Sequence, residues 1–385
     1  MTLITQNDQL QALCRRLTAA PYITVDTEFM RDRTYWPILC VLQVAGPEAD
    51  DAGVIDVLAP DMDLSPVYDL FDDPAIVKVF HAARQDIEIF HNQRRAIPMP
   101  LFDTQVAAMV CGFGDSVGYE TLVAKLAGGS IDKTSRFTDW SRRPLSKKQI
   151  DYALADVTYL RTVYLALCDR LEKSGRTAWV DEEMDILLNP STYEVVPDEA
   201  WRRLKARTNR PKFLAVLREI AAWREREAQR RDVPRNRILR DDTVTDIAAH
   251  APTKSEVLAR TRGLSDSLAK GRVGEAILEA VRRGLNTPPE AAPVLAPKPD
   301  LPKNIGPIID LLRVLLKMKC AEHDVAQKLV ASAADLELLA ADDKADIRAL
   351  HGWRRELFGE DALAIKHGQL ALAVNGRRLK LIATK

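Results

Sequence analysis

The first hundred residues carry apolar runs that are mostly too short for helices and long enough for strands. The expected strands are YITVDTEF (22–29), CVLQVAG (40–46), GVIDVL (53–58) and the start of IVKVFHA (76–82), whose end leads into a helix beginning near His81. QVAAMVCGF (105–113) has a helical pattern, and loop-forming residues dominate 112–144, apart from one short helix at 119–127. Strands that alternate with helices predict a mixed α/β domain.

The clearest single element is a long helix near residues 146–175. Ser146 and Gln149 have the spacing of a capping box, and Gly175 is the residue type that commonly ends a helix. Between these ends, apolar residues recur at helical period: Ile150, Ala153, Val157, Leu160, Val163, Leu167 and Leu171. We therefore expect this face of the helix to be buried in the core of the α/β domain.

Beyond Trp201 the pattern is mainly helical. The stretch TPPEAAPVLAPKPDLPKN contains six prolines and is typical of a semi-rigid linker. Near the end, LALAVNGRRLKLIA predicts a small hairpin around Asn375 and Gly376. We therefore expect four segments: a first domain over 1–197, a small all-α module over 205–287, a proline-rich linker over 288–303, and a second small helical module over 304–385.

The formal net charge of zero conceals a division along the chain. Residues 1–200 carry 19 basic and 31 acidic side chains, whereas residues 201–287 carry 21 basic and 11 acidic ones. Two interpretations follow from this division alone. The basic module binds a polyanion, or it is a solvated helical surface.

Other features exclude several classes of protein. No apolar run approaches the roughly 18 residues of a membrane span, and the first twenty residues lack the pattern of a secretory signal. The absence of a GxxxxGK[ST] run argues against a P-loop NTPase. The five cysteines are dispersed without a CxxC pair, which argues against a disulfide framework and a zinc site: Cys14, Cys40, Cys111, Cys168 and Cys320. We expect a cytoplasmic protein with no membrane partner.

Three separate elements each direct acidic side chains toward the interior of the first domain. Asp26 and Glu28 are two residues apart in an apolar strand, so they share a face and repel each other. Asp86 lies at the edge of the apolar stripe of its helix, where an acid needs a compensating partner. Tyr152 and Asp156 are four residues apart on the long helix and also share a face.

Bound divalent metal would offset the repulsion between these acids, because Mg²⁺ and Mn²⁺ prefer hard oxygen ligands. Two ions about 4 Å apart can activate water and stabilise the leaving oxygen of a phosphodiester. Tyr152 has no evident role as a ligand, but its hydroxyl is suited to orienting the attacking water. Taken singly, each acid is better explained by an ordinary structural role, such as an ion pair or a helix-dipole contact.

The motifs resemble those of a known superfamily. VDTEF, HAARQD and YALADV match, in order and spacing, the three exonuclease motifs of the DEDD superfamily, and the YxxxD form of the third is similar to its tyrosine branch. The flanking stretches DTEFMRDRTYWPILCVLQVA and DKTSRFTDWSRRPLSKKQIDYALADVTYL resemble the bacterial ribonuclease D family. Residues 208–287 resemble the HRDC domain of that family, and the last block resembles its second HRDC-like domain more weakly.

This resemblance implies an RNase H-like α/β exonuclease domain followed by two small all-α, HRDC-like domains. It implies a 3′-to-5′ exoribonuclease that uses two divalent metal ions, Mg²⁺ or Mn²⁺, and releases nucleoside 5′-monophosphates. The expected metal ligands are Asp26, Glu28, Asp86 and Asp156, with Tyr152 as the fifth catalytic residue. The implied partners are tRNA precursors and the 3′ ends of other structured RNAs, and we expect a monomer. The alternatives are a DNA exonuclease of the same superfamily and a non-catalytic RNA-binding protein.

Further residues are candidates for substrate binding. The aromatic side chains of Phe29, Tyr35 and Trp36 either stack on a terminal base or pack at the lip of the site. Four basic residues of the loop before the long helix either hold phosphates or are solvated: Lys133, Arg136, Arg142 and Arg143. His81 is interpreted as a structural residue that forms a hydrogen bond near the end of its strand. A related branch of the superfamily uses a histidine in the third motif, but this chain has Tyr152 at that position.

Overall fold

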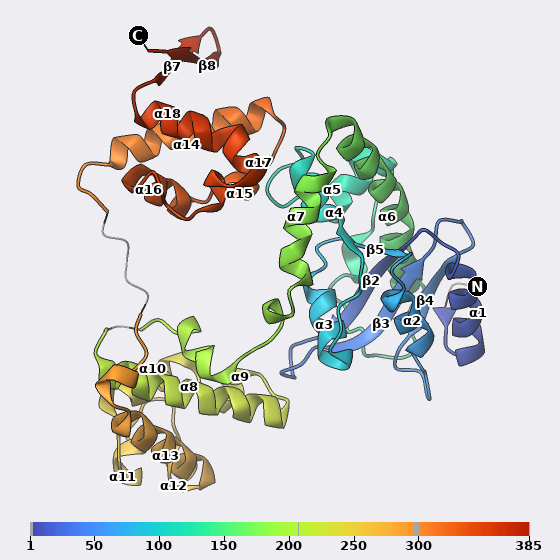
Figure 1. The fold of residues 1–385 in the computed structure, drawn as a ribbon. Helices are drawn as coiled ribbons and strands as arrows, with labels where there is room; N and C mark the ends of the chain where they lie inside the picture. Colours follow the sequence, from blue (N-terminus) through green and yellow to red (C-terminus); the bar gives the residue numbers. More distant parts are fainter. Residues whose placement is uncertain (1–2, 207, 296–300, 385) are drawn as a thin grey trace.

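The computed structural model describes residues 3–206, 208–295 and 301–384 (Figure 1). Its first part is built on a six-stranded sheet with the order β1-β4-β3-β2-β5-β6. The strands are β1 (Leu3–Ile4), β2 (Tyr22–Met30), β3 (Ile38–Ala45), β4 (Ala52–Asp56), β5 (Val77–Phe80) and β6 (Leu101–Asp103). The expected α/β fold is confirmed. The expected proline-rich linker over 288–303 falls partly on residues 296–300, which lie outside the described residues.

The central strand β2 pairs antiparallel with β3 and parallel with β5. In the register with β5, Thr24 lies opposite Val79, so β5 ends beside the middle of β2. The chain that leaves β5 therefore emerges next to Asp26. This topology brings the first two acidic motifs to one edge of the sheet.

Helices cover both faces of this sheet. They are α1 (Asn7–Leu17), α2 (Ser65–Asp72), α3 (Arg84–Arg94), α4 (Thr104–Val110), α5 (Tyr119–Leu122), α6 (Lys147–Ser174) and α7 (Thr177–Leu188). Ile23 and Val25 of β2 join the core cluster that α1, α2 and α3 also enter. The hydroxyl of Thr24, which points to the other face, donates to the carbonyl of Val157 on α6 at 2.8 Å. Alternation along β2 therefore turns Asp26 and Glu28 toward α6.

The long helix α6 follows the prediction closely. Ser146 and Gln149 form the capping box, and Gly175 ends the helix with a left-handed φ of +68°. The expected apolar stripe is buried, except that Ile150 is only half-buried. Because this stripe is packed against β2, β3 and β4, the polar residues at its edge are held in fixed positions beside the sheet.

The basic module forms its own core. Its helices are α8 (Pro211–Arg231), α9 (Arg235–Ile238), α10 (Asp241–His250), α11 (Ser255–Leu258), α12 (Asp266–Lys270) and α13 (Arg272–Asn286). Asp232 ends α8 in the left-handed conformation, with a φ of +48°. Its carboxylate accepts the amides of Tyr35 and Trp36 at 3.0 Å each. One residue therefore both ends α8 and attaches the module to the loop after β2.

The last block lies beside α7 and α4 (Figure 1). It contains α14 (Gly306–Glu322), α15 (Gln327–Val330), α16 (Ala333–Ala341), α17 (Gly352–Arg354), α18 (Glu360–Lys366), β7 (Leu370–Asn375) and β8 (Arg378–Ala383). The hairpin of β7 and β8 was expected, and Asn375 pairs with Arg378 across its turn.

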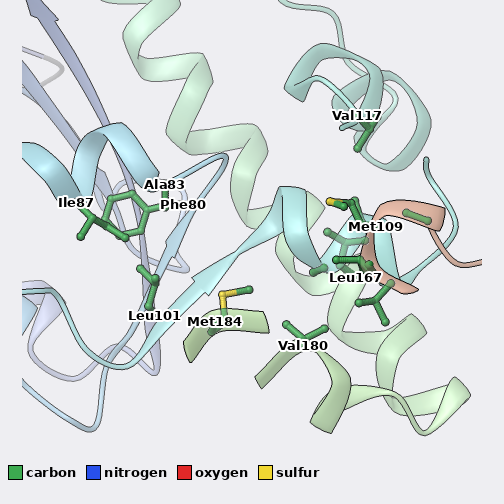
Figure 2. Packing of buried hydrophobic residues seen from close by; sticks show 14 of the residues in the cluster. Phe80, Ala83, Ile87, Leu101, Met109, Val117, Leu167, Val180 and Met184 are labelled. Atoms are coloured by element: carbon green, nitrogen blue, oxygen red, sulfur yellow. The ribbon is translucent and has the colours of Figure 1, made fainter. Parts of the chain in front are cut away.

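This last block shares one hydrophobic core with the α/β domain. Figure 2 shows Met109, Leu167 and Val180 gathered in that core, while Phe80, Ala83 and Ile87 continue it toward the sheet. The amide of Ala326 donates to the carbonyl of Met109 at 2.9 Å. The block therefore packs against the α/β domain through apolar side chains and this backbone hydrogen bond.

The contact is reinforced by a buried ionic cluster. The guanidinium of Arg354, whose side chain is 1% exposed, pairs with Glu182 at 2.5 Å and with the buried Glu183. Its Nε donates to the carbonyl of Leu329 at 2.7 Å. The neighbouring rings of Trp179 and Trp353 stack with centroids 4.1 Å apart. Helix α7 is thus held by both apolar and charged contacts from the last block.

Candidate active site

Strand β2 delivers the first two carboxylates. Asp26 and Glu28 occupy alternate positions and lie opposite Gln43 and Val41 of β3. The register shifts between Glu28 and Phe29, which indicates a β-bulge. A bulge bends its strand and redirects the side chains next to it. The bulge therefore lies directly after the acidic pair, whose side chains are partly buried.

Helix α3 delivers Asp86, but it begins at Arg84 rather than near His81 as the sequence predicted. The reason lies in Asp103 at the end of β6, whose carboxylate accepts the amides of Ala82 and Ala83 at 2.9 Å each. Ala82 has a left-handed φ of +59°, a conformation that costs a non-glycine residue about 1 kcal/mol or more. This tight turn delays the helix and places Asp86 in its first turn, beside β2.

Helix α6 delivers Tyr152 and Asp156. The backbone there is fixed from two sides, because Thr24 bonds to the carbonyl of Val157 and the hydroxyl of Tyr119 bonds to that of Asp156. The Tyr152 hydroxyl interacts with the Asp156 carboxylate, since each perturbs the pKa of the other. The third motif is therefore presented by a helix whose position relative to β2 is set by direct bonds.

These elements meet in a cleft of about 800 Å³. Carboxylate oxygens of Asp26, Glu28 and Asp156 all lie within 4.8 Å of one another. Asp86 also lines the cleft, and its carboxylate accepts a hydrogen bond from the Thr27 hydroxyl. All four predicted acids and Tyr152 thus line one cleft, three of the acids as a tight cluster and Asp86 as a neighbour.

The electrostatics of the cluster are those of crowded, dehydrated acids. Burial, and then the charge of Asp156, raises the pKa of Asp26 well above its usual range. Burial, and then the charges of Asp26, Asp156 and Asp86, raises the pKa of Glu28 to about 10. The pKa of Asp86 is raised by burial and by Asp26, and burial raises that of Asp156 to about 7. Among the described residues, no lysine or arginine forms an ion pair with any of the four.

This donor set fits divalent cations. Four hard oxygen ligands with raised pKa values lack a neutralising partner, and burying uncompensated charge is costly. Bound cations of the Mg²⁺ class would remove that cost. The candidate ligands are therefore those that the sequence indicated: Asp26, Glu28, Asp86 and Asp156.

Basic residues surround the mouth of the cleft. Arg31, Arg33, Lys133 and Arg136 line it together with Phe29. Arg31 pairs with Glu88 and Lys133 with Glu120, whereas Arg33 and Arg136 have no salt bridge to any described residue. Arg136 lowers the pKa values of Glu28 and Asp156, so its charge acts on the cluster. Of these residues, Lys133, Arg136 and Phe29 are candidates that the sequence predicted.

The position of Tyr35 does not support a role in stacking on substrate. Its side chain is 8% exposed, its hydroxyl donates to Glu225 on α8, and the guanidinium of Arg235 lies 4.8 Å from its ring centroid. Trp36 lies edge-on against Tyr35, with ring centroids 4.6 Å apart, and is not among the residues that line the cleft. Both aromatic residues serve the contact between the α/β domain and the basic module.

Two of the basic candidates also lie elsewhere. Arg143 forms a bidentate pair with Asp56 at the end of β4, with distances of 2.7 and 2.5 Å, and donates to the carbonyl of Cys40. It is therefore a structural residue that fixes the loop before α6. Arg142 is exposed and does not line the cleft. Neither side chain is placed to hold a phosphate beside the carboxylates.

His81 bonds near the end of its strand, as expected. Its Nδ1 lies 3.0 Å from the hydroxyl of Thr104, which in turn donates to the carbonyl of Phe80. Burial lowers the pKa of His81, which favours the neutral ring.

The fold and the acidic cleft define a class of enzyme, the 3′-5′ exonucleases, and a family model described as "3′-5′ exonuclease" matches residues 1–172. A second model, described as "HRDC domain", matches residues 213–281. These matches correspond to the α/β domain that holds the carboxylates and to the basic module α8–α13.

Relatives that match the whole chain identify the family within this class of enzyme. Ribonuclease D of Granulibacter bethesdensis is 53% identical over 384 residues, covering 100% of this chain and 97% of its own length. Ribonuclease D of Nitrobacter hamburgensis is 54% identical over 379 residues, covering 98% of each chain. The chain belongs to the ribonuclease D family.

A solved structure agrees with this assignment. The crystal structure of Escherichia coli RNase D, described as an exoribonuclease involved in structured RNA processing, has a TM-score of 0.80 and 31% identity. The match covers 95% of this chain and 98% of that one.

Among the described residues, no helix is long and apolar enough to cross a membrane.

Proposed function

We propose that this protein is a cytoplasmic exoribonuclease that trims the 3′ ends of tRNA precursors and other structured RNAs, releasing nucleoside 5′-monophosphates. The observation that carries the proposal is the cluster of Asp26, Glu28 and Asp156 within 4.8 Å on the floor of a cleft rimmed by cations. A phosphodiester is the substrate class that needs both features, because its charge must be neutralised before a nucleophile can attack. Family membership supports RNA as the polymer.

In this proposal, Asp26, Glu28, Asp86 and Asp156 hold two divalent cations, Mg²⁺ or Mn²⁺. When bound, such ions supply Lewis-acid stabilisation to both the attacking and the leaving oxygen of a phosphodiester. The chain contributes the position of these ligands: the Thr27 hydroxyl fixes Asp86, and the bonds at Thr24 and Tyr119 fix Asp156. Arg33 and Arg136, which have no carboxylate partner among the described residues, are the side chains available to neutralise the substrate's phosphates.

Tyr152 is assigned to orienting water. Burial, and then the charge of Asp156, raises the pKa of its phenol, so the hydroxyl keeps its proton at neutral pH. A protonated hydroxyl donates one hydrogen bond and accepts another, which suits it to align a water molecule rather than to act as a free base.

Tyr152→Phe is therefore expected to lower kcat by about 100-fold or more while leaving metal affinity unchanged. Only the hydroxyl is removed, and the ring can keep its contact with Trp140, whose centroid lies 6.2 Å away. Single-turnover rates measured beside calorimetric titration with Mn²⁺ separate the two effects. Weaker Mn²⁺ binding with unchanged chemistry would assign Tyr152 a purely structural role.

One digest tests the proposed function. Labelled RNA and DNA oligonucleotides of equal sequence, single-stranded and with duplex ends, are incubated with the protein with and without Mg²⁺. Stepwise loss of 5′-monophosphates from the 3′ end of RNA, only with metal, is the expected result. Preference for DNA would favour a DNA exonuclease, and binding of RNA without cleavage under every metal condition would favour a non-catalytic RNA-binding protein.

A further inference from the structure

A single aromatic ring stands out at the mouth of the cleft. Phe137 is 89% exposed, the largest exposed fraction among the large apolar residues that the structure describes. Phe137 is also among the residues that line the same cleft as Asp26, Glu28 and Asp156. An exposed phenylalanine forgoes the free energy of burial, and one placed beside an active site is a candidate for contact with the substrate.

The loop that carries Phe137 is anchored on both sides of this residue. Ser135 and Trp140, on either side of it, are buried with exposures of 4% and 2%. The Thr138 hydroxyl donates to the carbonyl of Ser135 at 2.7 Å and accepts from the amide of Gln149 at 3.1 Å. The loop is thereby tied to the first turn of α6, and Phe137 lies in the exposed stretch 136–139 between these anchors.

Charge around this ring matches a nucleotide. The guanidinium of Arg136 lies 5.2 Å from the centroid of the Phe137 ring, and Lys133 and Arg33 line the same cleft. A flat apolar surface surrounded by cations offers a stacking partner for a base and neutralising partners for the phosphates on either side of it. An apolar peptide would leave Arg33 and Arg136, which have no salt bridge to any described residue, without a partner.

We infer that Phe137 stacks on a nucleobase within the last three nucleotides at the 3′ end of the substrate. The inference rests on the proposed function, since it takes the carboxylate cluster as the place where that end is cleaved. Every base has a π-face, so the contact tolerates any sequence and does not distinguish ribose from deoxyribose. Phe137 would thus hold the end of the strand in place, while other groups select RNA.

The first test is an affinity measurement in EDTA, where cleavage does not occur. A 5′-labelled single-stranded RNA is titrated with wild-type protein and with Phe137→Ala, and anisotropy is recorded. We expect affinity to fall by roughly 5- to 150-fold in the variant, the range that loss of one base–aromatic stack produces. Phe137→Trp, which keeps a flat ring, should retain affinity within about threefold, and DNA of the same sequence should lose the same factor as RNA.

Abasic substrates make the test specific for stacking. Removing the base from each of the last three positions in turn should identify one position at which wild type and Phe137→Ala bind equally. Val374→Ala is the matched control, because Val374 is 77% exposed on the hairpin and does not line the cleft. It should bind RNA as wild type does, and all three variants should melt within about a degree of wild type, as surface substitutions usually do.

The inference is overturned if Phe137→Ala binds intact RNA as tightly as wild type, or if its loss persists on all three abasic substrates. Because the measurement needs no metal and no cleavage, it stands apart from the digest. A protein that fails to degrade RNA but shows the abasic signature would refute the proposed function and keep the stacking site. A protein that degrades RNA but lacks the abasic signature would keep the proposed function and refute the stacking site. Phe137 would then be a surface for another partner.

Discussion

Asp26→Asn is expected to reduce kcat by about a thousandfold or more while leaving the protein folded. Asp26 belongs to the acidic cluster, within 4.8 Å of the carboxylates of Glu28 and Asp156. A neutral amide cannot balance divalent charge, and loss of metal-based stabilisation costs several kcal/mol of activation free energy, or about 10³-fold in rate. Asp32→Asn is the matched control, because Asp32 also lines the cleft but is exposed and outside the cluster.

The same variant should melt at the same temperature as wild type or higher in EDTA, because one repulsive charge is gone. The effect depends on pH. The pKa of Asp26 is raised by folding, so the native state binds more protons than the unfolded chain above about pH 4. Stability in EDTA therefore falls as the pH rises from 5 toward 8 in wild type, and falls less steeply in Asp26→Asn.

Thermal denaturation at several pH values, with and without Mn²⁺, measures these slopes. Mn²⁺ should raise the melting temperature of wild type more than that of Asp26→Asn, since binding to the native state stabilises it. Turnover near the wild-type rate in the folded variant, or a melting temperature that rises with pH in EDTA for wild type, would contradict the assignment of Asp26.

Arg354→Met should destabilise the protein by about 3–5 kcal/mol, the cost of removing one partner from a buried ion pair. The substitution keeps an apolar side chain of similar length beside Trp353 but leaves Glu183, which is 5% exposed, with Arg348 as its remaining partner. The carbonyl of Leu329 also loses its donor. Urea denaturation followed by circular dichroism measures the change in the free energy of unfolding.

The adjacent Arg355 provides the control. Its side chain is 53% exposed and lies 3.5 Å from Glu360, so Arg355→Met removes a surface pair worth at most about 1 kcal/mol. Comparable losses in the two variants would mean that the buried cluster does not hold the last block to α7. A large loss in Arg354→Met alone is the expected pattern.

The sequence predicted the elements whose pattern is long or whose ends carry recognisable caps. Helix α6 is the clearest case, because its apolar stripe recurs along most of a 28-residue helix and its capping box has the expected bonds. Strands β1 and β6, with two and three residues, escaped prediction since no periodicity can be read from so few positions. The start of α3 was placed too early because the amides of Ala82 and Ala83 bond to Asp103, a residue twenty positions away.

The candidate site also contains residues that the sequence could predict and residues that it could not. The four acids and Tyr152 could be found because three motifs match those of the DEDD superfamily in order and spacing. All five residues line one cleft. Tyr35 could not be placed, since a buried contact with α8 and an exposed stacking face require the same residue type. Phe137 was missed because its exposure depends on the anchoring of Ser135 and Trp140, which no local pattern reveals.

The core shared by the α/β domain and the last block has a consequence for synthesis on the ribosome. Helix α7 ends at Leu188, whereas α14 begins at Gly306, so more than a hundred residues, including the whole HRDC domain, are translated between two parts of one core. At typical elongation rates this interval lasts on the order of 10 s. During that time Trp179 and the apolar side chains of α7 lack their final partner, the last block.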